Sequence, residues 1–245
     1  MRLPRDFRRG QLYGVTQRGN NGQWVYVDDE DFRKAMDLMR KYAQRHEVLI
    51  HGWSLLNSHG HWIFEASGEE SISNLMRDMQ SQHSRYLNLK YKTRPWMLLG
   101  YLGDGKPPGF SLFWKAGPVN WAPRFDADPL DAESFRSFLR YIELNPVQVK
   151  MRKRAEDWPW SSASAHLTGT DHEGLLCLDR WRDAFGQPAA IVEQWRAYMH
   201  APLKEERAKA LQARVWSTGS AHNRVKGWVR PAMVVAAASS GVKPG

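Results

Sequence analysis

The sequence lacks three features that would place it in a broad class of proteins. It has a single cysteine, Cys177, which excludes an intramolecular disulfide framework and a zinc site built from several cysteines. No apolar run approaches the ~18 residues that a membrane span needs. The opening MRLPRDFRRG carries charge without a following apolar segment, unlike a secretory signal. We therefore expect a cytoplasmic protein with no membrane partner.

Acidic residues are also in deficit. The chain has 35 Lys and Arg against 26 Asp and Glu, which gives a formal net charge of +9 and a sequence pI of about 9.7. This balance favours a polyanionic partner, with nucleic acid as the first candidate. Residues 201–245 hold eight Lys or Arg and only two acids. This tail is either a phosphate-binding arm or a solvated basic segment, and charge alone leaves both open.

The hydrophobic pattern predicts an α+β fold. Extended segments are expected in LYGVTQRGNN and WVYV, in a hairpin formed by 48–57 and 59–67, and near 96–102, with amphipathic helices over 29–45 and 71–91. Alternation of strands and helices in this order is typical of a ferredoxin-like antiparallel sheet with helices packed on one face.

A third helix is expected to start after Asp128, with Pro129 in its first turn. It should end near Asn145, because Pro146 disfavours helical geometry in the residue before it. Further helical patterns occupy about 178–213. We therefore expect a domain over 1–168 and a helical, basic C-terminal extension over 169–245.

Four side chains suggest chemistry. His59 and His61 alternate on a strand and so share a face, while Tyr141 and Asn145 are one turn apart on the third helix. If that helix packs on the strand, two imidazoles and an amide oxygen suit Mg²⁺ or Mn²⁺, and the phenol could attack a phosphodiester. Taken singly, each has a simpler interpretation as a surface histidine, a packed ring or a helix end.

Three motifs together resemble the REP-associated tyrosine transposases, IS200-like members of the HUH superfamily of single-strand DNA endonucleases. They are SHGH at 58–61, YIELNP at 141–146 and DWPWSS at 157–162. The resemblance runs from about residue 10 to residue 168.

By this resemblance His59, His61 and Asn145 would be metal ligands and Tyr141 the nucleophile. The activity implied is metal-dependent cleavage and joining of single-stranded DNA near palindromic hairpins, through a 5′-phosphotyrosine intermediate. The partner would be single-stranded DNA with hairpin structure. A monomer is favoured over a homodimer, and neither is excluded.

The resemblance also suggests three DNA contacts, Arg18 and Asn20 in an early turn and Arg124 further along the chain. Trp158 and Trp160 either stack on bases or, in the simpler interpretation, lock the chain after the third helix. Glu65 shares a strand face with the histidines and is either a second-layer group at the metal or a solvated carboxylate.

One position departs from the family pattern. Gly60 stands between the histidines, where a bulky hydrophobic residue is usual, and glycine weakens a strand. One alternative is therefore an impaired relative that binds structured single-stranded DNA without cutting it. Another is an RNA-binding protein, which would need exposed aromatic residues on the central strands, such as Trp53, Trp62 and Phe64.

Overall fold

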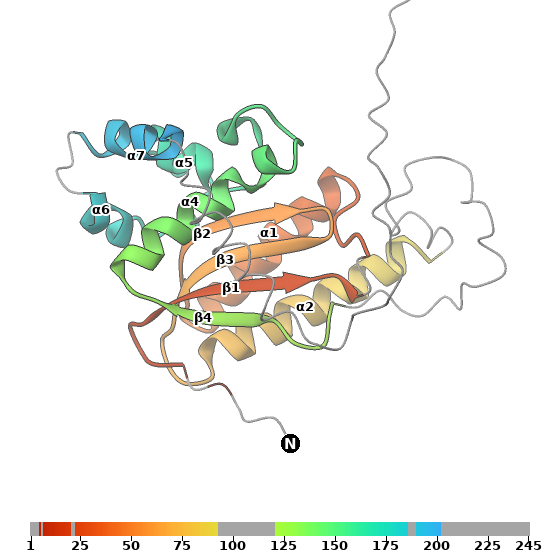
Figure 1. Cartoon of the computed structure of the whole chain (residues 1–245). Helices are drawn as coiled ribbons and strands as arrows, with labels where there is room; N and C mark the ends of the chain where they lie inside the picture. The colour runs from red at the N-terminus through yellow and green to blue at the C-terminus, as the bar shows by residue number, and fades with distance from the viewer. Residues whose placement is uncertain (1–4, 6, 21–22, 93–120, 186–189, 202–245) are drawn as a thin grey trace, which may run out of the picture.

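The centre of the molecule is a four-stranded antiparallel sheet with strand order β2-β3-β1-β4 (Figure 1). The computed structural model describes residues 5, 7–20, 23–92, 121–185 and 190–201. The strands are β1 (Leu12–Arg18), β2 (Leu49–Leu56), β3 (His59–Glu65) and β4 (Asp126–Leu130). The predicted α+β class and the β2–β3 hairpin are confirmed, whereas WVYV at 24–27 is not a strand.

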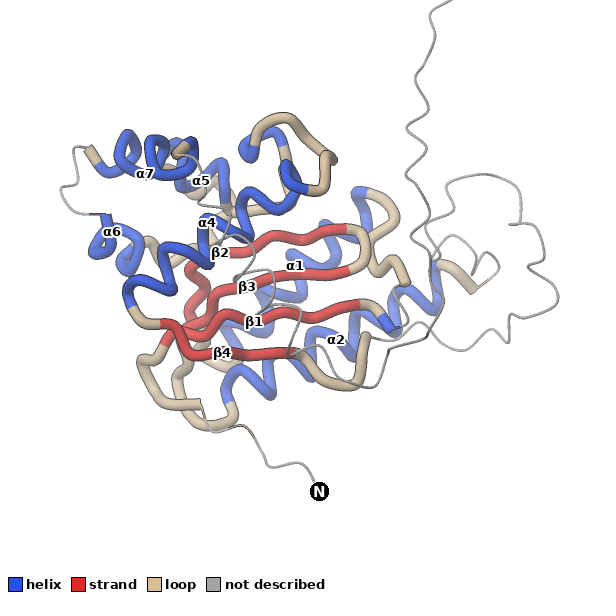
Figure 2. Tube along the Cα trace, in the orientation of Figure 1, coloured by secondary structure: helices blue, strands red, loops and turns tan. Residues whose placement is uncertain are grey.

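Helices join and follow these strands (Figure 2). They are α1 (Asp29–Arg45), α2 (Ser71–Lys90), α4 (Ala132–Gln148), α5 (Ala163–Thr168), α6 (Asp179–Phe185) and α7 (Ile191–His200). The first two are the helices that the sequence predicted. Helix α1 begins where Asp28 and Asp31 form a capping box, with each carboxylate accepting a hydrogen bond from a backbone N–H of the other's residue. None of the described helices is long and apolar enough to cross a lipid bilayer.

The sheet is covered on both faces. Helices α1 and α2 lie on one face, over a core that includes Trp53, Trp62 and Phe64. Helix α4 crosses the opposite face, where Phe138, Leu139 and Ile142 pack with Leu12 and Ile63 in a second core. The expectation of helices on one face therefore holds for α1 and α2 only, because the apolar stripe of α4 is buried against the other side of the same sheet.

Both predicted ends of the third helix need correction. Residues Asp126–Leu130 form the edge strand β4, in which Pro129 is tolerated, and Asp131 caps a helix that starts at Ala132. The helix continues through Pro146 to Gln148. Pro146 lies in the last turn, so its missing N–H removes one hydrogen bond only, and its own carbonyl accepts the Met151 N–H at 2.8 Å.

The C-terminal helices pack beside α4. Trp181 of α6 and Trp195 of α7 are buried in the core that α4 forms with the sheet. The segment before α5 runs along the outer edge of β2, with Leu55 N–H donating to Trp160 O at 2.9 Å. The division at residue 168 stays a prediction. The expected strand near 96–102 and the basic tail from 202 onward lie outside the described residues.

Candidate active site

Two histidines start strand β3. His59 and His61 alternate with Gly60 and therefore point to the face that α4 covers, with their ring centroids 5.0 Å apart and the planes at 84°. The two-residue connection of the β2–β3 hairpin ends just before His59. On the neighbouring strand β1, Arg18 is paired with His59 and Thr16 with His61. The register thus gathers these four side chains at one end of the sheet.

A hydroxyl group lies within hydrogen-bond distance of Nδ1 in each ring. Thr16 Oγ1 lies 2.9 Å from Nδ1 of His61, and Ser58 Oγ lies 3.1 Å from Nδ1 of His59. The Nε2 atom of His61 is buried and has no hydrogen-bond partner. This leaves Nε2 as the ring nitrogen for a ligand, in the arrangement that metal-binding histidines usually adopt.

Both imidazoles are neutral at physiological pH. Burial, with a contribution from the Arg18 charge, lowers the pKa of His59 to about 3. Burial, then His59 and then Arg18, lowers the pKa of His61 well below its ordinary value. Neutral imidazole is the form that binds a cation.

Tyr141 of α4 reaches the same place. Its ring centroid lies 5.6 Å from that of His61, at an interplanar angle of 77°. The helix approaches closely because two strand positions beneath it lack side chains. A Cβ at Gly14 would lie 2.9 Å from Phe138, and a Cβ at Gly52 would lie 2.5 Å from Leu139. Glycine at these positions therefore sets the height of the tyrosine above the sheet.

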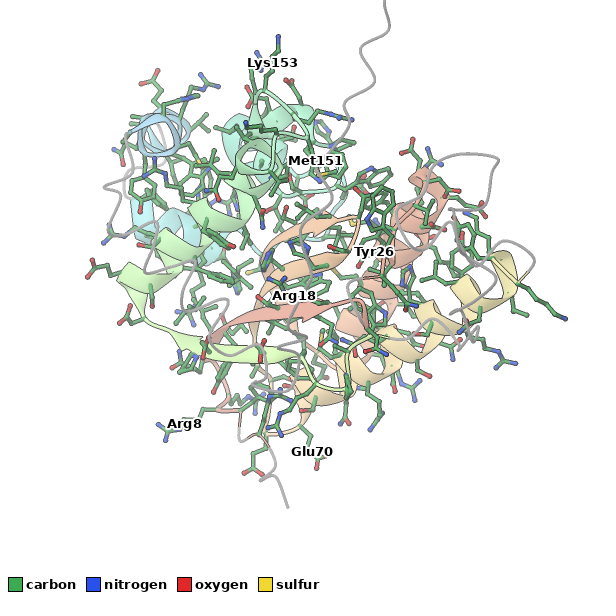
Figure 3. All side chains as sticks on the ribbon, turned by 45° about the vertical axis from the view of Figure 1, so that its right-hand side comes forward. Arg8, Arg18, Tyr26, Glu70, Met151 and Lys153 are labelled. Atoms are coloured by element: carbon green, nitrogen blue, oxygen red, sulfur yellow. The ribbon has the colours of Figure 1, made fainter. Side chains whose placement is uncertain are left out.

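Tyr141 is buried, with 9% of the residue exposed. Burial raises its pKa, and the nearby Arg18 charge acts in the opposite direction. The sequence had placed Arg18 in an early turn. It is instead the last residue of β1, and Figure 3 labels it. It therefore acts electrostatically on the tyrosine and on both histidines, and its expected contact with DNA stays a prediction.

Asn145 lies one turn after Tyr141 and is buried. Among the described residues no hydrogen bond joins its amide to either histidine, and its role as a third ligand stays a prediction. Within the same ranges no group of three or more His, Cys, Asp or Glu side chains could hold a metal ion. The two neutral imidazoles, with the unpartnered Nε2 of His61, are the part of the predicted ligand set that fits a divalent cation.

Asn20 and Arg124 lie apart from this cluster. Both line a groove between α2 and the segment that leads into β4. Glu65 is also removed from the histidine pair, at the far end of β3. Its Oε2 accepts hydrogen bonds from His51 Nε2 at 3.1 Å and from Arg180 Nε at 3.0 Å. It is therefore neither a partner of the metal ligands nor a simple solvated carboxylate.

Sequence reasoning missed a buried polar network behind Tyr141. Oε1 of Glu143 accepts hydrogen bonds from Ser162 Oγ and His166 Nδ1, both at 2.6 Å. Ser162 also accepts the Trp53 N–H at 3.1 Å, which connects α4 to β2. All three network side chains are fully buried. The sequence signal for this network was the position of Glu143 in the motif YIELNP and of Ser162 in the motif DWPWSS. Neither residue had been assigned a role from the sequence alone.

Gly60 is explained by its neighbour on the same face. A Cβ at Gly60 would lie closer than 3.0 Å to the Trp62 indole, so the ring fills the space of the missing side chain. An aromatic ring over a strand glycine compensates for the glycine's lack of packing. The Trp62 indole therefore fills the packing volume that the glycine leaves, and the expectation of a looser metal site stays a prediction.

The other aromatic residues considered from the sequence are structural. Trp158 donates its indole N–H to Leu55 O at 2.9 Å, and Trp160 stacks on Phe32 with centroids 5.0 Å apart. This confirms that they lock the chain after α4. The aromatic side chains of β2 and β3 are buried under α1 and α2, so the sheet lacks the exposed aromatic face that the RNA-binding alternative required.

Comparison with known proteins finds a match to one family over part of the chain. Residues 23–98 match the family described as Transposase IS200 like, a segment that contains both histidines and ends before Tyr141. No curated protein sequence matches the chain.

Two solved structures are similar. The structure of a REP-associated tyrosine transposase bound to a REP hairpin shares 19% identity, with 73% of this chain and 90% of that one covered and a TM-score of 0.50. A protein from Deinococcus radiodurans R1 assigned as a transposase shares 12% identity over 58% of this chain and 96% of that one, with a TM-score of 0.37. The resemblance indicated by the sequence is thus confirmed: this chain matches the IS200-like transposase family over residues 23–98 and has the fold of a REP-associated tyrosine transposase.

Proposed function

We propose that this protein cleaves and rejoins single-stranded DNA beside hairpins, with Tyr141 as the nucleophile. The observation that carries the proposal is the convergence of Tyr141 from α4 with the His59–His61 pair from β3, at 5.6 Å between the Tyr141 and His61 centroids. The family match to IS200-like transposases supports it, as does the fold shared with a structure that holds a REP hairpin.

The covalent step is a transesterification. The Tyr141 oxygen forms a bond to phosphorus, its proton passes to solvent or a neighbouring base, and the bond from phosphorus to the 3′ oxygen breaks. The 3′ oxygen leaves as a hydroxyl after taking up a proton, and the DNA becomes a 5′-phosphotyrosine. Attack by a 3′-hydroxyl reverses the step and rejoins the strand, so no external energy source is needed.

The residues around Tyr141 have distinct roles in this proposal. Arg18 stabilises the developing phenolate and the charged phosphate, which offsets the pKa increase that burial imposes on Tyr141. Thr16 and Ser58 fix the orientation of the imidazoles. His59 and His61, with Asn145 as the expected third ligand, would hold Mg²⁺ or Mn²⁺. When bound, such a cation polarises the phosphodiester.

The test uses labelled single-stranded DNA hairpins with flanking sequence, incubated with the protein and Mg²⁺ or Mn²⁺ and resolved on denaturing gels. The wild type should give a shifted protein–DNA band. Tyr141→Phe should abolish this band, and His61→Ala should reduce it at least 100-fold, the scale of a lost catalytic group. Tyr42→Phe provides a matched control, because it removes a tyrosine hydroxyl from α1, outside the site.

A band that survives Tyr141→Phe would contradict the assignment of the nucleophile. DNA binding without any covalent band, over a broad hairpin library and both metals, would favour the impaired binding relative. A band that forms equally well in EDTA would leave Tyr141 as the nucleophile and remove the metal from the proposal.

A further inference from the structure

A polar groove lies between α2 and the segment before β4, on the side of the sheet that α1 and α2 cover. Its volume is about 700 Å³. The described residues that line it include four arginines, Arg5, Arg77, Arg85 and Arg124, and no carboxylate. Figure 1 shows α2 and this segment along the β4 side of the sheet. Such a lining suits an extended polyanion.

Helix α2 supplies one wall from a single stripe. Its groove residues recur at spacings of three and four from Ser73 to Asn88, which places them on one side of the helix. Arg77 and Arg85 are two turns apart, roughly 12 Å along the axis. Asp78, the one acidic residue of α2, is bonded to His46 Nε2 at 3.0 Å and to Arg77. Arg85 has no ion pair within the described residues.

The opposite wall holds two arginines, Arg5 and Arg124, whose positive charges repel each other. The Arg5 guanidinium lies 3.8 Å from the Phe125 ring centroid and donates a hydrogen bond to the Phe125 carbonyl. Burial, and next the positive charge of Arg124, lower the pKa of Arg5 to about 10, while the Asp126 carboxylate acts in the opposite direction. At the groove, Gln80 has a buried side-chain nitrogen without a hydrogen-bond partner. An anion with oxygen acceptors would relieve both the repulsion and the unpaired donor.

The groove is joined directly to the site. The Ala122 N–H donates to the Arg18 carbonyl at 2.8 Å, and Gly19 forms a β-bridge with Trp121. Arg18 thus has its side chain by Tyr141 and its backbone at the groove wall. A chain with phosphates at regular intervals could follow this path from the reacting phosphate past Arg18 to Arg124 and Arg85.

We propose that this groove binds the sugar–phosphate backbone of the single-stranded flank of the DNA substrate. The roughly 12 Å between the two α2 arginines lets them contact different phosphates of one strand. The proposal rests on the proposed function, since it names the part of the substrate that lies beside the reacting site. It predicts that the flank contributes affinity without sequence preference.

The experiment measures binding of two labelled DNAs by fluorescence anisotropy over a range of salt concentrations. One is a hairpin with a single-stranded flank, and the other is the same hairpin with blunt ends. The test variant is Arg77→Gln with Arg85→Gln. The control variant, Arg33→Gln with Arg45→Gln, removes the same charge from exposed positions on α1, outside the groove.

For the flanked hairpin, the slope of log affinity against log salt should become shallower by about 1.4 in the groove variant, from two lost contacts at about 0.7 each. The blunt hairpin and the control variant should keep the wild-type slope. An unchanged slope for the flanked hairpin would overturn the proposal. An equal loss for the blunt hairpin would also overturn it, and would assign the groove to the stem.

The same samples separate this inference from the proposed chemistry. Flank-dependent binding that requires Arg77 and Arg85, without any covalent product from the wild type, would contradict the transferase and support the groove. A covalent product with wild-type salt dependence in the groove variant would support the transferase and overturn the groove. Circular dichroism of both double variants excludes unfolding as the cause of a loss.

Discussion

The two faces of the sheet are built from different kinds of residue. The face under α1 and α2 carries Trp53, Trp62 and Phe64, each no more than 2% exposed. The face under α4 carries glycines and hydroxyl groups around His59 and His61, and these let one helix approach closely enough to deliver Tyr141. The first face provides most of the packing that stabilises the fold. The second uses small residues to create space for the side chains of the candidate site.

The largest contrast should come from one substitution on each face. Trp62→Ala should lower the free energy of unfolding by about 3–5 kcal/mol, since it empties a fully buried indole volume. Tyr141→Phe should change it by no more than about 1 kcal/mol and still abolish the covalent product. Urea denaturation and the denaturing gel measure the two effects. A Tyr141→Phe variant that unfolds as readily as Trp62→Ala would show that the second face is also a packing core.

Low pH should lower the free energy of unfolding through protonation of His83, which lies on the side of the sheet that α1 and α2 cover. This α2 side chain packs against Tyr26 and Trp121, and burial, partly opposed by Asp31, lowers its pKa to about 4. The unfolded state therefore binds the proton more readily, and stability falls as pH drops from about 6.5 towards 4. The loss should reach at most about 3 kcal/mol.

His83→Leu should remove this part of the pH dependence, measured as the change in unfolding free energy between pH 7 and pH 4.5. His172→Gln is the control, because His172 is exposed. The difference between variant and wild type isolates His83 from the histidines of the other face. An identical pH dependence in His83→Leu would show that His83 takes up its proton in the folded state.

The face of the sheet under α1 and α2 was more predictable from the sequence than the face under α4. Hydrophobic periodicity located α1, α2 and the β2–β3 hairpin almost to the residue, because their burial follows from local pattern. Proline rules misplaced both ends of α4, since Pro129 sits on an edge strand and Pro146 in a last turn, and tertiary packing decides both. Spacing found His59, His61 and Tyr141, but the position of Arg18 and the Glu143 network depend on contacts between distant segments.

The network behind Tyr141 links the two faces, and Glu143→Gln should reveal how much the site depends on it. The substitution keeps the shape and replaces two charge-assisted hydrogen bonds by neutral ones of roughly half the strength, at a cost of about 1–3 kcal/mol. Because Glu143 is two residues from Tyr141, formation of the covalent product should slow while DNA affinity stays unchanged.

Glu193→Gln, at an exposed position of α7, is the matched control. A positioning role requires that Glu143→Gln affects the rate of the covalent step at saturating DNA, whereas a purely structural role would affect only the amount of folded protein. Wild-type kinetics in a destabilised Glu143→Gln variant would restrict the network to stability.

The smallest effect concerns Gly60, and it tests whether the faces are coupled through a single strand. Gly60→Val places a side chain where the Trp62 ring lies, so it should cost about 1–3 kcal/mol even though valine favours strands. Trp62→Leu frees that space, and the double variant should therefore be more stable than the sum of the two single changes, with a coupling that a double-mutant cycle measures by urea denaturation.

Leu89→Ala, at an exposed position on α2, should show no coupling with Gly60→Val. If Gly60→Val alone proved more stable and more active than the wild type, the indole would not replace the missing side chain, and the glycine would be a defect at the site. If the coupling appears, the strand that carries the histidines depends for its packing on an aromatic ring of the opposite face.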